Sequence, residues 1–109
     1  MTGIVNVTIT APDVETLTGL TRELVETGLA ASGNITEHVR SVYRWEGEVH
    51  EANEAVVSLR TQARHVAAIV ELTKQRHPYV TPHVVAVPIV GGNPDYENWV
   101  IDSTRGHDQ

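Results

Sequence analysis

Two histidines flank a proline-containing turn at residues 78–82, and their side chains are the best suited in this sequence to hold a metal ion. His77 and His83 stand at either end of the turn, with Tyr79 between them. Neutral imidazole binds copper, zinc and nickel well, so two converging histidines predict a divalent-cation site open to water. Because two imidazoles rarely bind a cation tightly, a carboxylate from another subunit would have to complete the site.

A structural account of the same two histidines is also open. Proline cannot continue a helix and favours extended geometry in the residue before it, so Pro78 predicts that a helix ends at His77. A basic side chain there interacts favourably with the helix dipole, and His83 would then be an exposed strand residue. The other histidines form no i, i+4 helical pair and no HxH strand pair: His38, His50, His65 and His107.

Tyr43, Arg44 and Trp45 are consecutive residues near the end of a predicted hairpin. Since side chains alternate along a strand, Tyr43 and Trp45 share one face and Arg44 lies on the other. Aromatic residues and arginine are enriched at protein interfaces, which favours packing between subunits. A platform for a small molecule or a partner protein is the alternative.

Acidic residues crowd the same hairpin at Glu46, Glu48, Glu51 and Glu54. Glu46 and Glu48 flank Gly47 at a turn, which is too mobile for a tuned acid–base pair. A solvated hairpin face is the favoured interpretation, and binding of a hard cation is the alternative. The sequence has no Ser-His-Asp order, glycine-rich phosphate loop or zinc-hydrolase helix, so we expect a protein that is not an enzyme.

The composition excludes several classes of partner and site. With 8 basic and 14 acidic residues the formal charge is −6, which argues against nucleic acid and anionic membranes as partners. The absence of cysteine excludes disulfide scaffolds, thiolate metal sites and thiol nucleophiles. No signal peptide is visible and no apolar run approaches the roughly 20 residues that span a bilayer, so we expect a cytoplasmic protein.

Alternating strand and helix patterns predict a single domain over residues 1–109. β-branched, period-two segments predict strands, with a possible bend or bulge at 32–34, over residues 4–10, 35–45, 48–61 and 84–90. Apolar residues at three- and four-residue steps predict a helix between an Asp13 N-cap and Gly28 just beyond its end. Further helices are predicted over 62–76 and over 93–103, the last one started by Asn93 with Pro94 in its first position.

This order of elements predicts an α+β fold, a ferredoxin-like βαββαβ sandwich with an extended β-hairpin and a short C-terminal helix. Right-handed crossovers would place two helices on one face of the sheet. The opposite face, rich in valine and isoleucine, would then lack a cover from its own chain. Self-association is the economical way to bury it, and the edges of the long hairpin could pair with a neighbour.

The sequence also carries a set of short stretches that are informative together. They are Leu29-Ala30-Ala31-Ser32, Asn34-Ile35, Ser41-Val42-Tyr43-Arg44-Trp45-Glu46-Gly47-Glu48, Arg60-Thr61, His77-Pro78-Tyr79 with Pro82, and Pro88-Ile89-Val90 with Gly92-Asn93-Pro94, Tyr96 and Trp99. In this order and spacing they resemble the CutA family, whose members are called divalent-cation tolerance proteins. The resemblance covers nearly the whole chain.

Similarity to that family implies a ferredoxin-like homotrimer whose long β-hairpins are exchanged between subunits. It also implies a link to copper and other divalent metals, and a trimer that resembles the PII signalling proteins in architecture. This chain departs from the family pattern at Ser32 and Ile9, where members commonly or sometimes have Cys. Val80 and His83 stand where many members have Glu, and Arg60 replaces the usual Lys. Binding of copper by thiolate is therefore not implied.

Three functions remain as hypotheses. The first is a homotrimer that binds copper, zinc or another divalent cation weakly through His77 and His83, with Tyr79 shaping the pocket. The second is a trimer whose inter-subunit clefts bind a small molecule or anion, and the third is a structural scaffold for a partner protein. The predicted hydrogen-bond donors of the cleft are Asn34, Arg44, Arg60 and Tyr79. The predicted trimer-interface residues are Tyr43, Trp45 and Trp99.

Overall fold

The computed structural model describes residues 3–105, so His107 lies outside the described residues. The elements follow the predicted order. The strands are β1 (Ile4–Ala11), β2 (Ser32–Trp45), β3 (Glu48–Gln62) and β4 (Val84–Pro88), and the helices are α1 (Val14–Glu26), α2 (Val66–Arg76) and α3 (Pro94–Ser103). A short 3-10 turn, η1 (Ala63–His65), leads into α2. None of the helices between residues 3 and 105 has the length and apolar character needed to cross a membrane.

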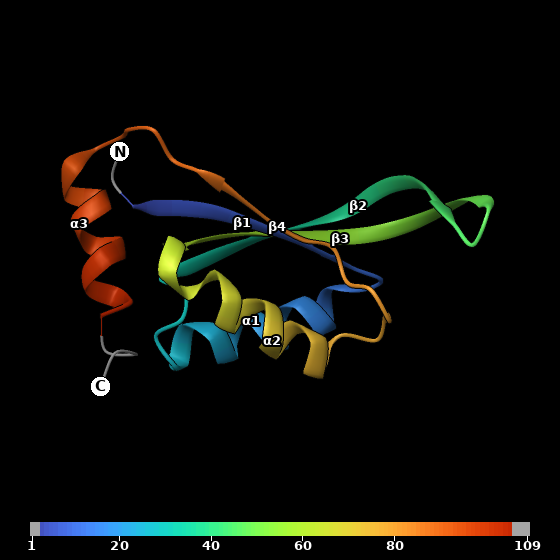
Figure 1. The fold of residues 1–109 in the computed structure, drawn as a ribbon, viewed down its shortest axis with the longest axis horizontal. Helices are drawn as coiled ribbons and strands as arrows, with labels where there is room; N and C mark the ends of the chain where they lie inside the picture. The colour runs from blue at the N-terminus through green and yellow to red at the C-terminus, as the bar shows by residue number, and fades with distance from the viewer. Residues whose placement is uncertain (1–2, 106–109) are drawn as a thin grey trace.

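The four strands form one antiparallel sheet in the order β2-β3-β1-β4. α1 and α2 lie side by side against one face of this sheet, and α3 lies beyond its end, next to the start of β1 (Figure 1). The arrangement confirms the predicted α+β, ferredoxin-like βαββαβ architecture. It also leaves the opposite face of the sheet without a helix, and we call this surface the open face.

Alternation along the strands separates the core from the open face. In β1 the odd-numbered residues from Val5 to Ala11 are buried beneath α1 and α2, whereas the even-numbered ones from Asn6 to Thr10 are only partly buried on the open face. α1 contributes its apolar stripe to the same core, as the helical spacing predicts. Core side chains with little or no exposure are Val7, Ile9, Leu17, Leu20, Leu24, Val57, Leu59 and Ile69.

The helix ends follow local chemistry that was readable in the sequence. The Asp13 side chain accepts the Thr16 backbone N–H at 2.7 Å and caps α1, and Gly28 follows the helix with a φ of 78°. Asn93 caps α3, with Pro94 as the first helical residue. α2 ends at His77, whose extended backbone agrees with the restraint that the following proline imposes.

The predicted bulge at residues 32–34 is wrong, because the register of β2 against β3 is regular there and shifts between Thr36 and Val39. His38 in this interval has a φ of 62°, a left-handed conformation that histidine adopts more readily than most residues. Beyond the bulge β2 and β3 continue as a projecting hairpin (Figure 1). The hairpin closes at Glu46 and Gly47, both with positive φ, as a tight two-residue turn requires. β4 also ends two residues earlier than predicted, at Pro88.

Two surface carboxylates make the stability of the fold depend on pH. The backbone hydrogen bond from Thr16 lowers the pKa of Asp13 below its ordinary value of 3.8. A bidentate hydrogen bond from Arg76, at 3.0 and 3.1 Å, joins α2 to α1 and lowers the pKa of Glu23 below 4.5. Because both pKa values are lower in the folded state, the stabilisation is present above the ordinary values and is lost as pH falls through the folded-state ones.

We therefore expect the melting temperature to fall between about pH 5 and pH 3, and to fall less steeply in Asp13→Asn and Glu23→Gln. Asparagine is the matched replacement at position 13 because it also caps helices. Differential scanning calorimetry across this range checks the expectation. Identical slopes for the wild type and both variants would contradict it.

Candidate functional site

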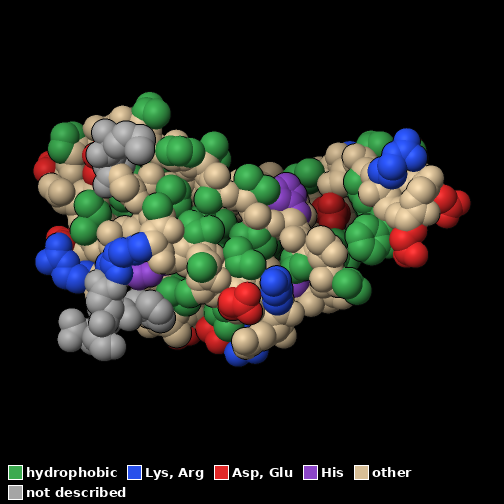
Figure 2. Space-filling model, viewed as in Figure 1, with side chains coloured by type: hydrophobic (Ala, Val, Ile, Leu, Met, Phe, Trp, Pro, Cys, Tyr) green, Lys and Arg blue, Asp and Glu red, His purple; other side chains and the backbone are tan. Residues whose placement is uncertain are grey.

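A groove of about 810 Å³ lies on the open face and runs from the turn between α2 and β4 along the hairpin as far as Trp45. Its walls are mainly aromatic and aliphatic, and its charged or titratable side chains other than tyrosine are Glu54 and His83. The lining residues are Thr8, Thr10, Val39, Ser41, Val42, Tyr43, Trp45, Glu54, Val56, Pro78, Tyr79, Val80, Thr81 and His83. Hydrophobic side chains are exposed along the molecule from the α3 end to the hairpin (Figure 2).

His77 is held at the edge of the sheet by both of its ring nitrogens. Nε2 lies 2.6 Å from the Thr10 carbonyl oxygen, and Nδ1 accepts the Tyr79 backbone N–H at 3.1 Å. These partners require the neutral tautomer with its proton on Nε2. The side chain is buried, and its ring packs on that of Tyr79 with centroids 4.8 Å apart. His77 would have to break one of these bonds to bind a cation.

His83 is exposed at the rim of the groove, immediately before β4. His83 and His77 thus lie at opposite ends of the turn. The imidazole of His83 is exposed, whereas that of His77 is buried and hydrogen-bonded at both ring nitrogens. The predicted roles of both residues as metal ligands stay predictions. Among residues 3–105, no three His, Cys, Asp or Glu side chains are grouped so that they could hold a metal ion.

Glu54 is the groove residue that the sequence reasoning missed. It was assigned to a solvated hairpin face, and this assignment is wrong because only 8% of the residue is exposed. The 78–83 turn folds over this part of β3, and the Tyr79 hydroxyl donates to Glu54 Oε2 at 2.9 Å. The sequence offered one indication of this burial. Position 54 lies at the base of the hairpin and not at its solvated end, and strand alternation puts it on the same face as Val56 and Arg60.

Burial and the contact with Glu54 both disfavour the ionised form of Tyr79 and raise its pKa. Burial, followed by the hydrogen bond to Glu54, raises the pKa of Tyr79 to about 12. Since this value exceeds the ordinary 10.0, the stabilisation is complete below pH 10.0 and is lost as pH rises through about 12. In Glu54→Gln we expect the pKa of Tyr79 to fall yet remain above its ordinary value, because burial is the larger cause.

Titration of tyrosinate absorbance in the wild type, Glu54→Gln and Tyr79→Phe checks this expectation. The Tyr79→Phe variant should lack the last transition seen in the wild type. An unchanged last transition in that variant would contradict the assignment.

Arg60 is the centre of a polar cluster at the other end of the open face. Its Nε donates to the Tyr96 hydroxyl at 3.3 Å, and Nη1 donates to Asn6 Oδ1 at 3.3 Å and to Ser58 Oγ at 3.0 Å. Nη2 donates to Asn34 Oδ1. Every one of these acceptors is a neutral group, and no ion pair of Arg60 is present in the described part of the chain.

Within one chain, the four predicted cleft donors lie at three separate places. Arg60 and Asn34 belong to the polar cluster, whereas Tyr79 lies in the groove. Arg44 is at the end of the hairpin, where its Nη1 donates to the Gly47 carbonyl oxygen at 3.3 Å. The predicted roles of these residues in binding a ligand stay predictions.

The predicted interface residues are exposed aromatic side chains at two places. Tyr43 and Trp45 line the groove and are 42% and 44% exposed, and Tyr43 stacks on the ring of His50 at 5.6 Å. Trp99 on α3 is 46% exposed, and its ring lies 5.5 Å from that of Tyr96. Their exposure suits an interface, and their role in a trimer stays a prediction.

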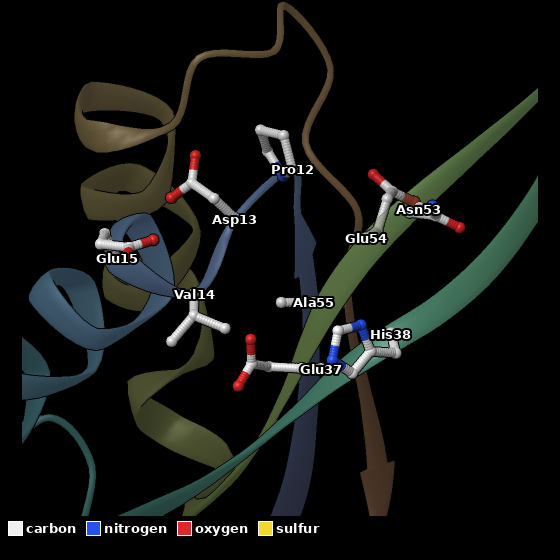
Figure 3. A pocket seen from close by; sticks show the side chains of 9 residues that line it. All are labelled: Pro12, Asp13, Val14, Glu15, Glu37, His38, Asn53, Glu54 and Ala55. Carbon is white, nitrogen blue, oxygen red and sulfur yellow. The ribbon is translucent and has the colours of Figure 1, made fainter.

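A smaller pocket of about 220 Å³ lies on the other side of Glu54, between the start of α1 and the bulge in β2. Figure 3 shows Asp13 and Glu15 at the start of α1 and Glu37 and His38 on the bulged strand. Glu54 lines this pocket as well as the groove. The pocket gathers negative charge, but its residues do not form a group able to hold a metal ion.

These features define a ferredoxin-like α+β protein with a projecting hairpin, one open sheet face and a groove that runs along the hairpin. Residues 5–103 match the family model of the CutA1 divalent ion tolerance protein, and the chain belongs to this family. It is similar to the divalent-cation tolerance protein CutA of Thermus thermophilus, with 39% identity over 98 residues that cover 90% of this chain and 95% of the relative.

Solved structures agree with the sequence comparison. The structure of the divalent cation tolerance protein from Thermus thermophilus superimposes with a TM-score of 0.90 and 38% identity, covering 93% of this chain and 98% of that one. The structure of CutA1 from Oryza sativa also gives a TM-score of 0.90, with 36% identity over 96% of this chain and 98% of the other.

Proposed function

We propose that this chain is a non-enzymatic divalent-cation tolerance protein that acts as a homotrimer and binds copper or zinc weakly. The observation that carries the proposal is the apolar groove on the open face, in a chain whose relatives are named for divalent-cation tolerance. The cytoplasmic location expected from the sequence stays a prediction.

The case for self-association rests on exposed apolar side chains. Val85 and Val87 on β4 are 54% and 52% exposed on the open face, and Val85 pairs with Thr8, which lines the groove. Monomeric proteins rarely leave so continuous an apolar surface in water. The hairpin also gives the molecule a longest dimension of 44 Å against 27 and 22 Å for the other two, so it can reach a neighbouring copy.

The case for weak cation binding rests on the chemistry at the rim of the groove. His83 offers an exposed imidazole there, and imidazole suits divalent copper and zinc. One imidazole requires further ligands, which we assign to carboxylates of a neighbouring copy. The formal charge of −6 raises the local concentration of cations around the protein.

Sedimentation equilibrium and calorimetric titration test the two parts separately. We expect a species of three times 11.9 kDa at micromolar concentration, and weak binding of Cu²⁺ and Zn²⁺ that His83→Ala reduces. A well-folded monomer at this dilution would overturn the homotrimer. Unchanged cation affinity in His83→Ala would overturn the assignment of that ligand.

A second candidate function is the binding of a small anion or metabolite in a cleft between subunits, in a PII-like manner. The specific observation in its favour is that the guanidinium of Arg60 has no carboxylate partner in the described part of its own chain. A ligand that binds only the folded protein raises its melting temperature, so a thermal-shift screen with nucleotides and small organic anions tests this function. If neither cations nor anions stabilise the protein, a scaffold for a partner protein is the remaining proposal.

A further inference from the structure

We infer that Arg60 of one copy forms an ion pair with Glu54 of a neighbouring copy when the open faces are covered. The inference rests on the homotrimer proposed above and names the charged contact that closes it. It follows from two opposite charges on the same surface, neither of which has a counter-charge within the described part of its own chain.

Glu54 has one carboxylate oxygen to spare. Oε2 accepts the Tyr79 hydroxyl, which is its one hydrogen-bond partner in the described structure. The residue is 92% buried by its own chain and opens into the groove, where it is the only carboxylate among the lining residues. A buried carboxylate of this kind is stable when a donor, preferably a cationic one, occupies its remaining lone pairs.

Arg60 has one N–H group to spare. A guanidinium carries five, and four of them donate to Tyr96, Asn6, Ser58 and Asn34. One hydrogen on Nη2 remains, together with a positive charge that these neutral acceptors do not balance. The four bonds also hold the side chain in a defined position on the open face, so little conformational freedom is lost when a further bond forms.

The two charges cannot meet within one chain. Glu54 and Arg60 are both on β3, six residues apart and on the same face of the strand. At about 3.3 Å per residue their backbones are separated by roughly 20 Å. A partner for either charge on this face must therefore come from outside the described part of the chain.

The other basic side chains are less suited to fill the groove. Those already paired with carboxylates of the same chain are Arg40, Lys74, Arg76 and Arg105. Arg44 is at the hairpin end, and Arg22 and Arg64 belong to α1 and η1 on the other side of the sheet. Arg60 alone comes from the open-face side of a strand, where a second copy must pack.

Covering the open face removes water from both charges, and an uncompensated buried charge is strongly unfavourable. Pairing Arg60 of each copy with Glu54 of the next satisfies both at once. Such a contact joins two different patches, and head-to-tail contacts of this kind form a ring when the rotation between copies closes. Three copies would then make three equivalent ion pairs.

A double-mutant cycle on the full chain tests the pair, with Glu54→Gln and Arg60→Gln as matched neutral variants. Glutamine at 54 still accepts from Tyr79, and glutamine at 60 still offers amide donors to the cluster. The measured quantity is the concentration at which half of the protein is trimeric, from sedimentation velocity, with urea added if the wild type does not dissociate at nanomolar dilution.

We expect each single variant to raise this concentration by about 30-fold or more, as loss of one partner of a buried pair does. The double variant should lie within about threefold of the larger single effect, because the second change removes nothing that remains. Residues roughly 20 Å apart in one folded chain should act independently, so non-additivity reports contact between copies. The control Arg22→Gln, which removes one positive charge from α1 on the other side of the sheet, should change the concentration by less than about threefold.

The possible failures are distinguishable. A monomeric wild type would overturn the proposed homotrimer and this inference together. A trimeric wild type whose two single effects multiply in the double variant would overturn this inference alone. If circular dichroism shows that Arg60→Gln does not fold, the charge-swapped double variant Glu54→Lys with Arg60→Glu replaces it. We expect this double variant to contain more trimer than the single variant Glu54→Lys. An equal or smaller trimer content in the double variant would also overturn the inference.

Discussion

Replacing His77 with alanine should lower the free energy of unfolding by about 2–4 kcal/mol, because the change removes two hydrogen bonds from a buried imidazole. The bond from Nε2 to the Thr10 carbonyl ties the end of α2 to β1, and the bond at Nδ1 orders the turn that carries Tyr79. Loss of both should also loosen the contact between Tyr79 and Glu54. Urea unfolding of the two proteins at the same concentration measures the difference.

His83→Ala is the control for this prediction, since it removes an exposed imidazole near the same turn. Its stability should stay within about 0.5 kcal/mol of the wild type. Cation affinity should respond in the opposite order, with the larger loss in His83→Ala. If His77→Ala abolished cation binding yet left stability unchanged, His77 would be a ligand and its structural role would be wrong.

Replacing Gly33 with alanine should destabilise the protein by about 1–3 kcal/mol, as overpacking of a filled core does. A Cβ atom at this position would lie 2.6 Å from Thr21 Cγ2 and 2.9 Å from Leu59 Cδ2. Both neighbours are buried between α1 and the sheet, so neither can move aside without displacing others. Thermal and urea unfolding measure the loss.

Gly19→Ala is the matched control, because an added Cβ there has no atom within 4 Å and the residue lies in the middle of α1. This change should stabilise the protein by about 0.5–1 kcal/mol through helix propensity. Equal effects of the two substitutions would show that close packing at Gly33 does not limit the approach of α1 to the sheet.

The helix ends and the hairpin turn were predictable because their causes are local. Asp13 and Asn93 cap helices through hydrogen bonds to backbone only two or three residues away. Pro78 restricts the residue before it, and Gly47 supplies the positive φ of the turn. Each of these effects acts between neighbours in sequence, so no knowledge of the rest of the fold was needed.

The bulge and the partners of the site residues were not predictable in the same way. The shift near His38 depends on how β2 pairs with β3, and Gly33 is small because α1 approaches it from 12 residues earlier in the chain. The environment of Glu54 depends on a turn 25 residues further on. Four closely spaced glutamates predict a solvated surface, because glutamate side chains are usually exposed. Only the folded chain shows that one of the four is covered.

The amino-acid sequence alone determined the order of strands and helices, the absence of thiol chemistry and the family to which the pattern points. These properties follow from residue type, period and spacing along one dimension. The tertiary structure decided that His77 is a buried hydrogen-bonding residue, that Glu54 faces a groove and that Arg60 has only neutral partners among the described residues. Those properties depend on which distant segments meet, since hydrogen bonds and burial are set by neighbours in space and not by neighbours in the chain.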